Sequence, residues 1–242
     1  MIATRTNPSV TEIVGVAGTG KSTVTRTLVG RHGLLRVDDT LHVRLPGHWP
    51  AALRGTIRGL PLMAAGLIGS RRLRWDDLRF VLYVGGWSRR VARRRPNDEV
   101  LLLDQGPVFA LARLRVSGAA VTKTSVYRRW EAAMIDDWAR MLDLVLWLDA
   151  PDTVITARIN CRDQPHEVKG ASPGYADGFL SGYRDAYDTI IGRFERASRG
   201  PRVVRMDSSL VGAAELAEEV KWILGVGRRI PDESAADAVD GE

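Results

Sequence analysis

The chain contains few of the residues that build disulfides, zinc sites or membrane spans. Its 242 residues include one cysteine, Cys161, and four histidines. A single cysteine excludes an internal disulfide and is typical of a reducing compartment, and ligands this sparse do not build a zinc site. No apolar run approaches the roughly 20 residues that cross a bilayer, and residues 1–8 lack the apolar core of a signal peptide. We therefore expect a cytoplasmic protein.

Lysine is also scarce, so arginine carries most of the positive charge in a chain of net charge +6. Fourteen arginines lie between Arg31 and Arg95, against four acidic residues. A general preference for arginine often reflects genome composition, but this local surplus marks a basic region. Residues 231–242 are instead acidic and rich in small residues, and we expect them to form a disordered tail.

The segment from Gly15 to Ser22 matches the phosphate-binding pattern G-x-x-x-x-G-K-[ST]. A short apolar run precedes it and a helical pattern follows it, as such a loop requires. Its glycines let backbone N–H groups approach a phosphate, and the helix N-terminus adds partial positive charge. Lys21 can reach the β- and γ-phosphates, and the Ser22 hydroxyl can bind Mg²⁺. The residues expected to bind the nucleotide are Gly15, Val16, Ala17, Gly18, Thr19, Gly20, Lys21, Ser22 and Thr23.

Short apolar runs alternate with helical patterns along the chain. The expected strands are 10–16, 34–37, 99–104, 142–149 and 202–207. The expected helices are 21–31, 76–95, 107–116, 125–141, 152–162, 175–197 and 210–224. This alternation predicts an α/β fold with a parallel sheet, because parallel strands need crossover connections. Several runs are almost continuously apolar, as in strands covered on both faces. We expect one domain over residues 1–230.

Three aspartates, Asp104, Asp149 and Asp207, follow apolar runs at positions where open α/β sheets bind ligands. Asp104 closes the run 100–104, which matches the Walker B pattern and predicts a role in the magnesium shell or as a base. The alternative is a buried strand that ends in an ordinary turn. Asp149 is followed by Ala-Pro-Asp152, and this segment fits turn and helix-start chemistry equally well.

A basic segment at 158–174 follows the fourth expected strand. Arg158 and Arg162 are four residues apart and would share one helix face. A basic lid that closes over transferring phosphates would neutralise developing charge and exclude water. His166 and Lys169 are weaker candidates for the same role. The alternative is a solvated basic loop.

These residues resemble the group of P-loop kinases that includes thymidylate kinases and deoxynucleoside kinases. The similar segments are Gly-Thr-Gly-Lys-Ser-Thr, Leu-Leu-Leu-Asp-Gln-Gly and Leu-Trp-Leu-Asp-Ala-Pro-Asp. The resemblance implies a three-layer P-loop NTPase fold, in which helices cover both faces of a five-stranded parallel sheet. It also implies ATP as the phosphoryl donor, Mg²⁺ bound through Ser22, and Asp104 near the metal.

The chain departs from the thymidylate kinase pattern at two places. Asp104 is followed by Gln105 where those enzymes usually have arginine, and Val37-Asp38-Asp39 replaces their Arg-Glu-Pro segment. An acid after the second strand is similar to the general base of nucleoside kinases, so Asp38 or Asp39 is a candidate base. The alternative is a helix N-cap for the following segment.

Residues 41–95 are expected to form a helical insertion on the acceptor side. An apolar stripe that includes Leu53, Ile57 and Leu60 lies beside arginines, and Pro61 and several glycines are expected to interrupt any long helix. One interpretation is a helical subdomain that packs on the core. The other is a basic amphipathic surface in peripheral contact with an anionic membrane, which would suit a lipid-linked acceptor. A nucleic-acid partner is disfavoured because no base-reading module accompanies the arginines.

Together, these features predict ATP- and Mg²⁺-dependent transfer of a phosphoryl group to a small molecule. A nucleoside or nucleotide is the expected acceptor by resemblance. A sugar or membrane-linked alcohol kinase, and a slow nucleotide-hydrolysing switch, are alternatives. A homodimer is left open.

Overall fold

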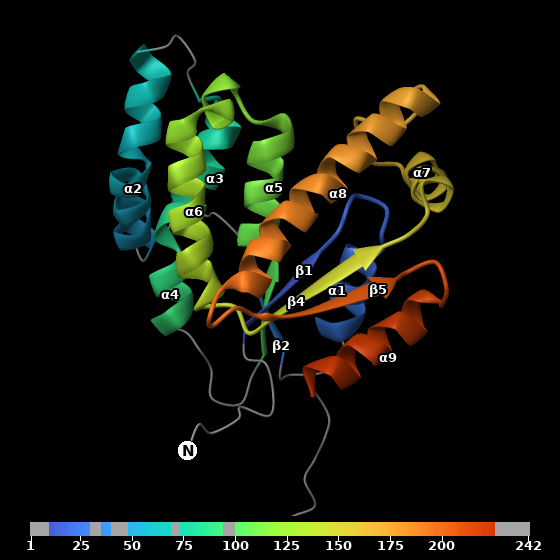
Figure 1. Cartoon of the computed structure of the whole chain (residues 1–242). Coiled ribbons are helices and arrows are strands. Elements are labelled where there is room, and N and C mark those ends of the chain that lie inside the picture. Colours follow the sequence, from blue (N-terminus) through green and yellow to red (C-terminus); the bar gives the residue numbers. More distant parts are fainter. Residues whose placement is uncertain (1–9, 30–34, 40–47, 69–72, 94–99, 226–242) are drawn as a thin grey trace, which may run out of the picture.

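The computed structural model describes residues 10–29, 35–39, 48–68, 73–93 and 100–225 (Figure 1). Five parallel strands form one sheet in the order β2-β3-β1-β4-β5. The strands are β1 (Val10–Val14), β2 (Leu35–Asp39), β3 (Val100–Asp104), β4 (Leu144–Asp149) and β5 (Arg202–Asp207). The expected α/β class with a parallel sheet is confirmed. The acidic tail and Arg94 and Arg95 lie outside the described residues.

The register places several chemically active segments at one edge of the sheet. Thr11 of β1 lies opposite Leu102 of β3 and Leu144 of β4, so β1 runs between these two strands. The carboxyl ends of parallel strands meet at the same edge. The loop after β1 therefore lies between Asp104, which ends β3, and Asp149, which ends β4.

Helices cover both faces of the sheet (Figure 1). They are α1 (Lys21–Val29), α2 (Trp49–Ile68), α3 (Trp75–Gly86), α4 (Ser88–Arg93), α5 (Pro107–Ser117), α6 (Ser125–Ala139), α7 (Asp152–Asn160), α8 (Pro173–Arg196) and α9 (Ala213–Leu224), with the short 3-10 helix η2 (Ala120–Lys123). Helices α1 and α9 pack together on one face, and α5 and α8 pack together on the other. The region expected as one helix over 76–95 is divided into α3 and α4 at Trp87.

The strand β4 shows why its sequence is apolar at every position before Asp149. Leu144, Leu146 and Leu148 join the apolar cluster beneath α1 and α9. Val145 and Trp147 join the larger cluster on the opposite face. Because successive side chains of a strand point to opposite faces, a continuous apolar run is needed when both faces are covered.

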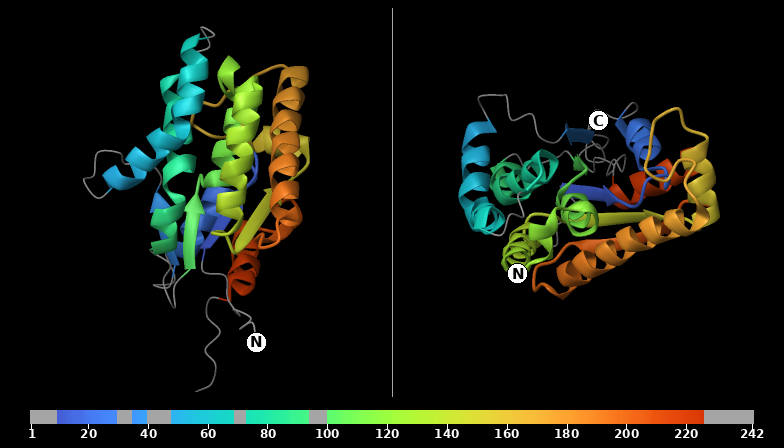
Figure 2. Two further views of the ribbon diagram at one scale, coloured as in Figure 1. Left: turned by 60° about the vertical axis from the view of Figure 1, so that its left-hand side comes forward. Right: turned by 90° about the horizontal axis from the view of Figure 1, so that it is seen from above.

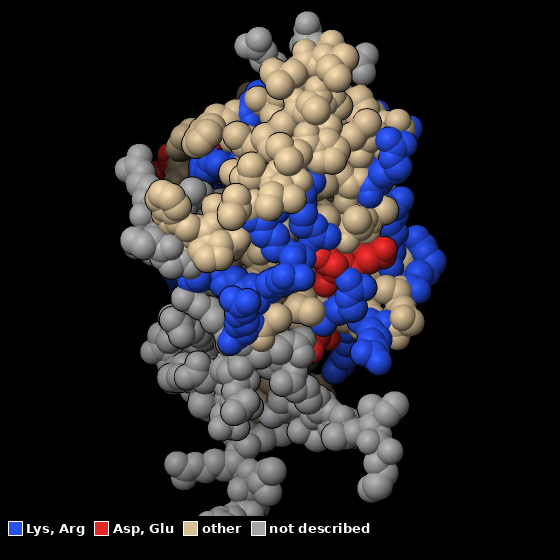
Figure 3. All heavy atoms as spheres, turned by 90° about the vertical axis from the view of Figure 1, so that its left-hand side faces the viewer, with Lys and Arg blue, Asp and Glu red and all other residues tan. Residues whose placement is uncertain are grey.

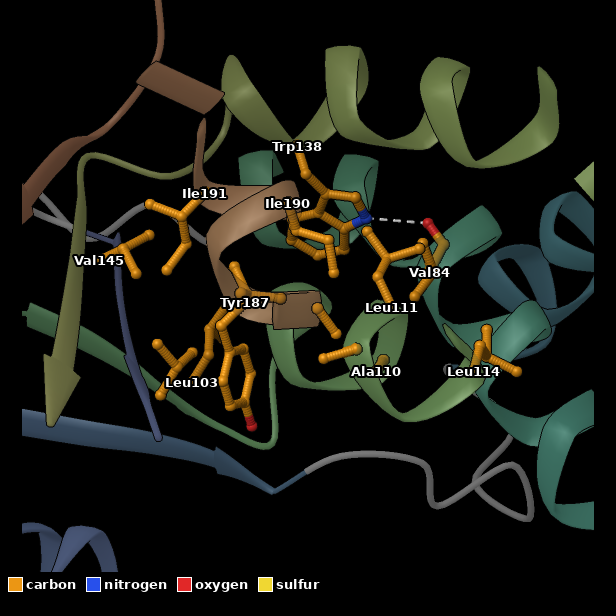
Figure 4. Packing of buried hydrophobic residues seen from close by; sticks show 14 of the residues in the cluster. Val84, Leu103, Ala110, Leu111, Leu114, Trp138, Val145, Tyr187, Ile190 and Ile191 are labelled. Atoms are coloured by element: carbon orange, nitrogen blue, oxygen red, sulfur yellow. Dashed lines mark hydrogen bonds between the residues drawn. The ribbon is translucent and has the colours of Figure 1, made fainter. Parts of the chain in front are cut away.

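The larger cluster binds the helices α3, α5, α6 and α8 into one unit (Figure 4). Trp138 of α6 is fully buried, and its indole N–H donates a hydrogen bond to the Val84 carbonyl oxygen at 2.9 Å. Ile190 and Tyr187 of α8 and Leu111 of α5 lie in the same cluster. A buried donor with its partner in place avoids a desolvation penalty, so this bond also fixes how α3 meets α6.

Helix α2 corrects one expectation from the sequence. Pro61 does not interrupt it, and the helix runs for 20 residues with Pro61 inside, although it changes direction near its middle (Figure 2). Pro61 is exposed, so water can satisfy the carbonyl that loses its helical donor.

The buried side of α2 is rich in glycine and meets α3 at very short range. A Cβ built on Gly55 would lie 2.2 Å from the Leu82 carbonyl oxygen. Packing of backbone against backbone therefore outweighs the low helix propensity of this sequence.

This packing predicts opposite effects for alanine at two helical glycines. Gly55→Ala should lower the free energy of unfolding by 2 kcal/mol or more, roughly the cost of overpacking a tight contact. Gly178→Ala in α8 is the matched control, because a Cβ there would meet nothing within 4 Å. It should stabilise the chain by about 0.5–1 kcal/mol through helix propensity. Urea unfolding measures both, and equal stabilisation by the two variants would contradict the α2–α3 contact.

Candidate active site

The loop between β1 and α1 borders a cavity of about 320 Å³. Gly15 has a φ of 147°, and a Cβ there would lie 2.1 Å from the Leu148 carbonyl oxygen. Only glycine fits, because a side chain would need a rare backbone conformation and space that β4 already fills. The Tyr187 hydroxyl donates a hydrogen bond to the Gly15 carbonyl oxygen at 3.2 Å, so α8 supports the loop from behind.

Most of the residues expected to bind phosphate lie on this cavity. The lining includes Gly15, Val16, Ala17, Gly18, Gly20, Lys21 and Ser22. Thr19 and Thr23 do not line the cavity. Thr19 is buried, and its hydroxyl donates to the Val16 carbonyl oxygen at 2.9 Å, which stabilises the turn itself. The Thr23 N–H donates to the Gly20 carbonyl oxygen at 3.0 Å, in the first turn of α1.

Lys21 folds back against the loop. Its ammonium group donates to the carbonyl oxygens of Gly15 and Val16 at 2.7 and 2.8 Å. Burial lowers the pKa of Lys21 to about 8, although the negative charge of Asp104 opposes this shift. The ammonium is therefore mostly protonated at neutral pH. An anionic phosphate in the cavity would favour the charged form further.

Asp104 and Gln105, at the end of β3, also line the cavity. Gln105 has a φ of 56°, the one non-glycine residue of the described segments with positive φ. Such backbone strain is often retained at functional sites. The described residues contain no group of three or more His, Cys, Asp or Glu side chains that could hold a metal ion. Ser22 and Asp104 still fit Mg²⁺, which commonly takes one or two protein ligands and completes its shell with phosphate and water.

Glu12 is a buried acid beside the site that the sequence analysis missed. Its side chain lies beneath α5 and accepts hydrogen bonds from the N–H groups of Val108 and Phe109 at 3.0 and 2.9 Å. A Cβ on Gly106 would lie 2.5 Å from the Glu12 carboxyl carbon, so this glycine makes room for the acid. Burial raises the pKa of Glu12 to about 8, although the two helix N–H groups oppose this. The one sequence signal was an acid inside an otherwise apolar strand.

The two arginines of the expected lid occupy different places. Arg162 lines the cavity together with His166. Arg158 instead donates hydrogen bonds to the Ser208 hydroxyl at 3.1 Å, the Ser208 carbonyl oxygen at 2.9 Å and the Gly18 carbonyl oxygen at 3.4 Å. It thereby joins the phosphate loop to the segment after β5. Burial lowers the pKa of His166, so the imidazole is mostly neutral at pH 7. The Lys169 ammonium donates to the Arg162 carbonyl oxygen.

Side chains of α5 and α8 form the far wall of the cavity. Phe109 and Arg113 come from α5, and Phe179 and Tyr183 come from α8. Arg113 donates a hydrogen bond to the Tyr183 hydroxyl at 3.4 Å and lies 3.9 Å from the Glu167 carboxylate. The sequence analysis missed these residues, because each one looks like an ordinary member of a helix.

Asp149 and Asp152 lie away from this arrangement, and the side chain of Asp38 cannot be placed. Asp149 accepts a hydrogen bond from Arg184 at 2.8 Å, and Asp152 pairs with the same arginine at 2.5 Å. Both acids therefore anchor α8 and α7 to the end of β4. Asp38 belongs to β2, but its side chain lies outside the described part of the chain. The backbone of its neighbour Asp39 lies opposite Asp104 in the sheet register.

Solved structures that are similar to this chain include a thymidylate kinase and a deoxyadenosine kinase. The thymidylate kinase of Candida albicans matches with a TM-score of 0.55 at 12% identity, over 90% of this chain and 92% of that one. The deoxyadenosine kinase of M. mycoides, solved with dCMP and dCDP, has a TM-score of 0.48 at 13% identity, over 89% of this chain and 98% of that one. No protein-family model and no curated protein matches. The resemblance read from the sequence is thus confirmed, and at these identities it establishes the fold alone.

The buried Glu12 predicts a pH dependence of stability. Between its ordinary pKa of 4.5 and about 8, the folded chain keeps a proton that the unfolded chain releases. This stabilisation is complete below pH 4.5 and is lost as the pH rises through 8. Relative to Glu12→Gln, which cannot titrate, the wild-type free energy of unfolding should fall by roughly 1.4 kcal/mol per pH unit between about pH 5.5 and 7.5. A pH-independent difference in urea unfolding would show that the helix N–H groups keep the carboxylate ionised.

Proposed function

We propose that this protein is a kinase that transfers the γ-phosphoryl group of ATP, with Mg²⁺, to a nucleoside or nucleotide. One observation carries the proposal. The phosphate loop, Asp104, Arg162 and a polar and aromatic far wall all border the same cavity. A cavity that only held a nucleotide would need the loop, but it would not need a second wall suited to an acceptor.

The donor side follows from the loop and its neighbours. The backbone N–H groups of the loop and Lys21 would hold the β- and γ-phosphates, and Lys21 would exchange its two carbonyl partners for phosphate oxygens. Ser22 and Asp104 would hold Mg²⁺, which neutralises charge on the phosphates when bound. Arg158 already bonds to the loop and to the segment after β5, a position suited to ordering the donor site.

The acceptor side follows from the far wall. Phe109 and Phe179 offer aromatic faces against which a nucleobase can pack. Gln105 and Arg113 offer hydrogen-bond donors to its edge or to an anionic group. Arg162, which lies in the expected lid segment and lines the cavity, would stabilise charge that develops on the transferring phosphoryl group.

The base that removes the acceptor proton is chosen among three acids. Asp38 or Asp39 is the candidate by resemblance, and the backbone of β2 ends at the same edge of the sheet as Asp104. Asp104 lies on the cavity itself but would be engaged with the metal. We retain Asp38 as the base and Asp104 as the metal ligand.

Lys21→Ala should reduce phosphoryl transfer by at least about 100-fold, because the charge that holds the γ-phosphate is lost. The protein should remain folded, since the lysine bonds only to loop carbonyls. Lys221→Ala is the control, because this lysine pairs with Glu218 on α9, away from the cavity. The measurement is ADP release with a panel of nucleosides and nucleoside monophosphates. Release that is independent of every acceptor would favour a slow hydrolase instead, and full activity of Lys21→Ala would refute the assignment.

The different positions of the two lid arginines predict different kinetic defects. Arg162→Met should lower kcat by roughly 100-fold, because a charge acting in the transition state is removed. Arg158→Met should mainly raise the KM for ATP, because its hydrogen bonds join the donor loop to Ser208. Steady-state kinetics at saturating acceptor separates the two. The same division between kcat and KM in both variants would contradict these roles.

A further inference from the structure

Helix α2 presents its large apolar side chains to the outside of the molecule. Trp49 and Ile68, at its two ends, are 70% and 89% exposed. Leu53, Ile57, Leu60 and Leu67 between them are also exposed. These six residues, which we call the α2 stripe, follow helical spacing and therefore share one face. Large contiguous apolar patches are uncommon on soluble proteins and mark interaction sites.

The stripe is exposed because the opposite side of α2 is used for close packing. Ala51, Gly55, Gly59, Leu62 and Gly66 are buried there. A larger side chain at Gly55 or Gly59 would meet backbone or side-chain atoms of α3 within 3 Å. The helix therefore cannot rotate to bury its leucines without losing this contact. The amphipathic pattern is fixed with its apolar face outward.

A basic hollow is continuous with the stripe. It has a volume of about 610 Å³ and is lined by Arg54 and Arg58 of α2 and by Arg89, Arg90 and Arg93 at α4. Leu53 and Ile57 of the stripe also line it, and no acidic side chain does within the described part of the chain. In Figure 3 a band of basic residues crosses this side of the molecule beside a broad uncharged surface.

The arginines that line the hollow lie close enough for their positive charges to repel one another. Arg54 and Arg58 both pair with Asp137 of α6, at 3.5 Å for Arg54. Burial and the neighbouring charges of Arg58 and Arg89 nevertheless lower the pKa of Arg54. A phosphate group in the hollow would relieve this repulsion and gain charge-assisted hydrogen bonds.

We propose that the α2 stripe and the basic hollow dock the protein on the surface of an anionic phospholipid bilayer. The stripe would enter the boundary between headgroups and acyl chains while the arginines bind lipid phosphates. No helix of the described residues is long and apolar enough to cross a membrane, so α2 would lie in the interface plane. This inference is independent of the proposed kinase activity.

A second copy of the chain fits this surface less well. In a two-fold interface the same patch meets itself, so the described lining of the partner's hollow brings the same arginines and no additional acidic side chain, while Asp137 already pairs with Arg54 and Arg58. A nucleic acid would match the charge but gains little from aliphatic residues such as Leu53 and Ile57, which do not stack on bases as aromatic rings do. The combination of aliphatic side chains and clustered arginine matches lipid chains and lipid phosphates.

The experiment is co-sedimentation of the full chain with vesicles of phosphatidylcholine alone or with about 30% phosphatidylglycerol. We expect binding to the anionic vesicles that weakens as salt rises, and little binding to the neutral ones. Leu53→Glu with Ile57→Glu should weaken partitioning by at least about tenfold, because acids enter the interface. Arg89→Ser with Arg93→Ser should weaken it by about tenfold and reduce its salt dependence.

Matched controls use residues of the same kinds at the opposite edge of the sheet. Leu210→Glu replaces another leucine, 78% exposed, after β5. Arg199→Ser with Arg202→Ser removes two exposed arginines, one just before the edge strand β5 and one at its first residue. Both controls should bind like the wild type. Circular dichroism checks that each variant is folded.

Three results would overturn the proposal. One is a folded wild type that does not bind anionic vesicles at low salt. Another is equal loss of binding in the control variants, which would reduce the effect to net charge. The third is a dimer, seen by light scattering, that Leu53→Glu with Ile57→Glu dissociates, because the stripe would then be covered by a second copy of the chain.

Discussion

The position of β1 between β3 and β4 is the constraint on which the candidate site depends. Parallel pairing on both sides of β1 forces its following loop to emerge beside Asp104 and against the backbone of Leu148. The close approach to Leu148 requires Gly15, and the buried Glu12 in the same strand fixes the start of α5. The phosphate loop and the start of α5 are thus positioned by one strand.

The features that the sequence predicted correctly are those that depend on residues close together in the chain. Glycines followed by Lys21, an apolar run that ends in Asp104, and alternating strands and helices each carry a signal within a few residues. Arg113 and Tyr183 carried none, and Glu12 only that of an acid within a strand, because these residues meet the site only after distant segments pack together. The different partners of Arg158 and Arg162 were hidden for the same reason. Both are arginines on one expected helix face, and only the position of Ser208 separates them.

Helix α2 shows where the sequence pattern left an orientation open. Its apolar stripe allowed two interpretations, packing on the core or contact with a membrane, and Pro61 was expected to interrupt the helix. In the structure, backbone contact through glycines decides the orientation, and helix propensity yields to packing. The small residues of a helix can therefore predict its buried face better than its large ones when two backbones approach closely. This rule would have identified the exposed surface before any coordinates were known.

Helix α8 runs from the far wall of the cavity into the hydrophobic core without a break. Its first half supplies Phe179 and Tyr183 to the cavity, and its second half places Ile190 and Ile191 among fully buried residues (Figure 4). Tyr187, between the two halves, bonds to the phosphate loop. The wall that we propose for the acceptor therefore continues directly into the packed centre of the molecule. Selection among acceptors would then follow a fixed shape on this side, and adjustment to different substrates would fall to the segment between α7 and α8.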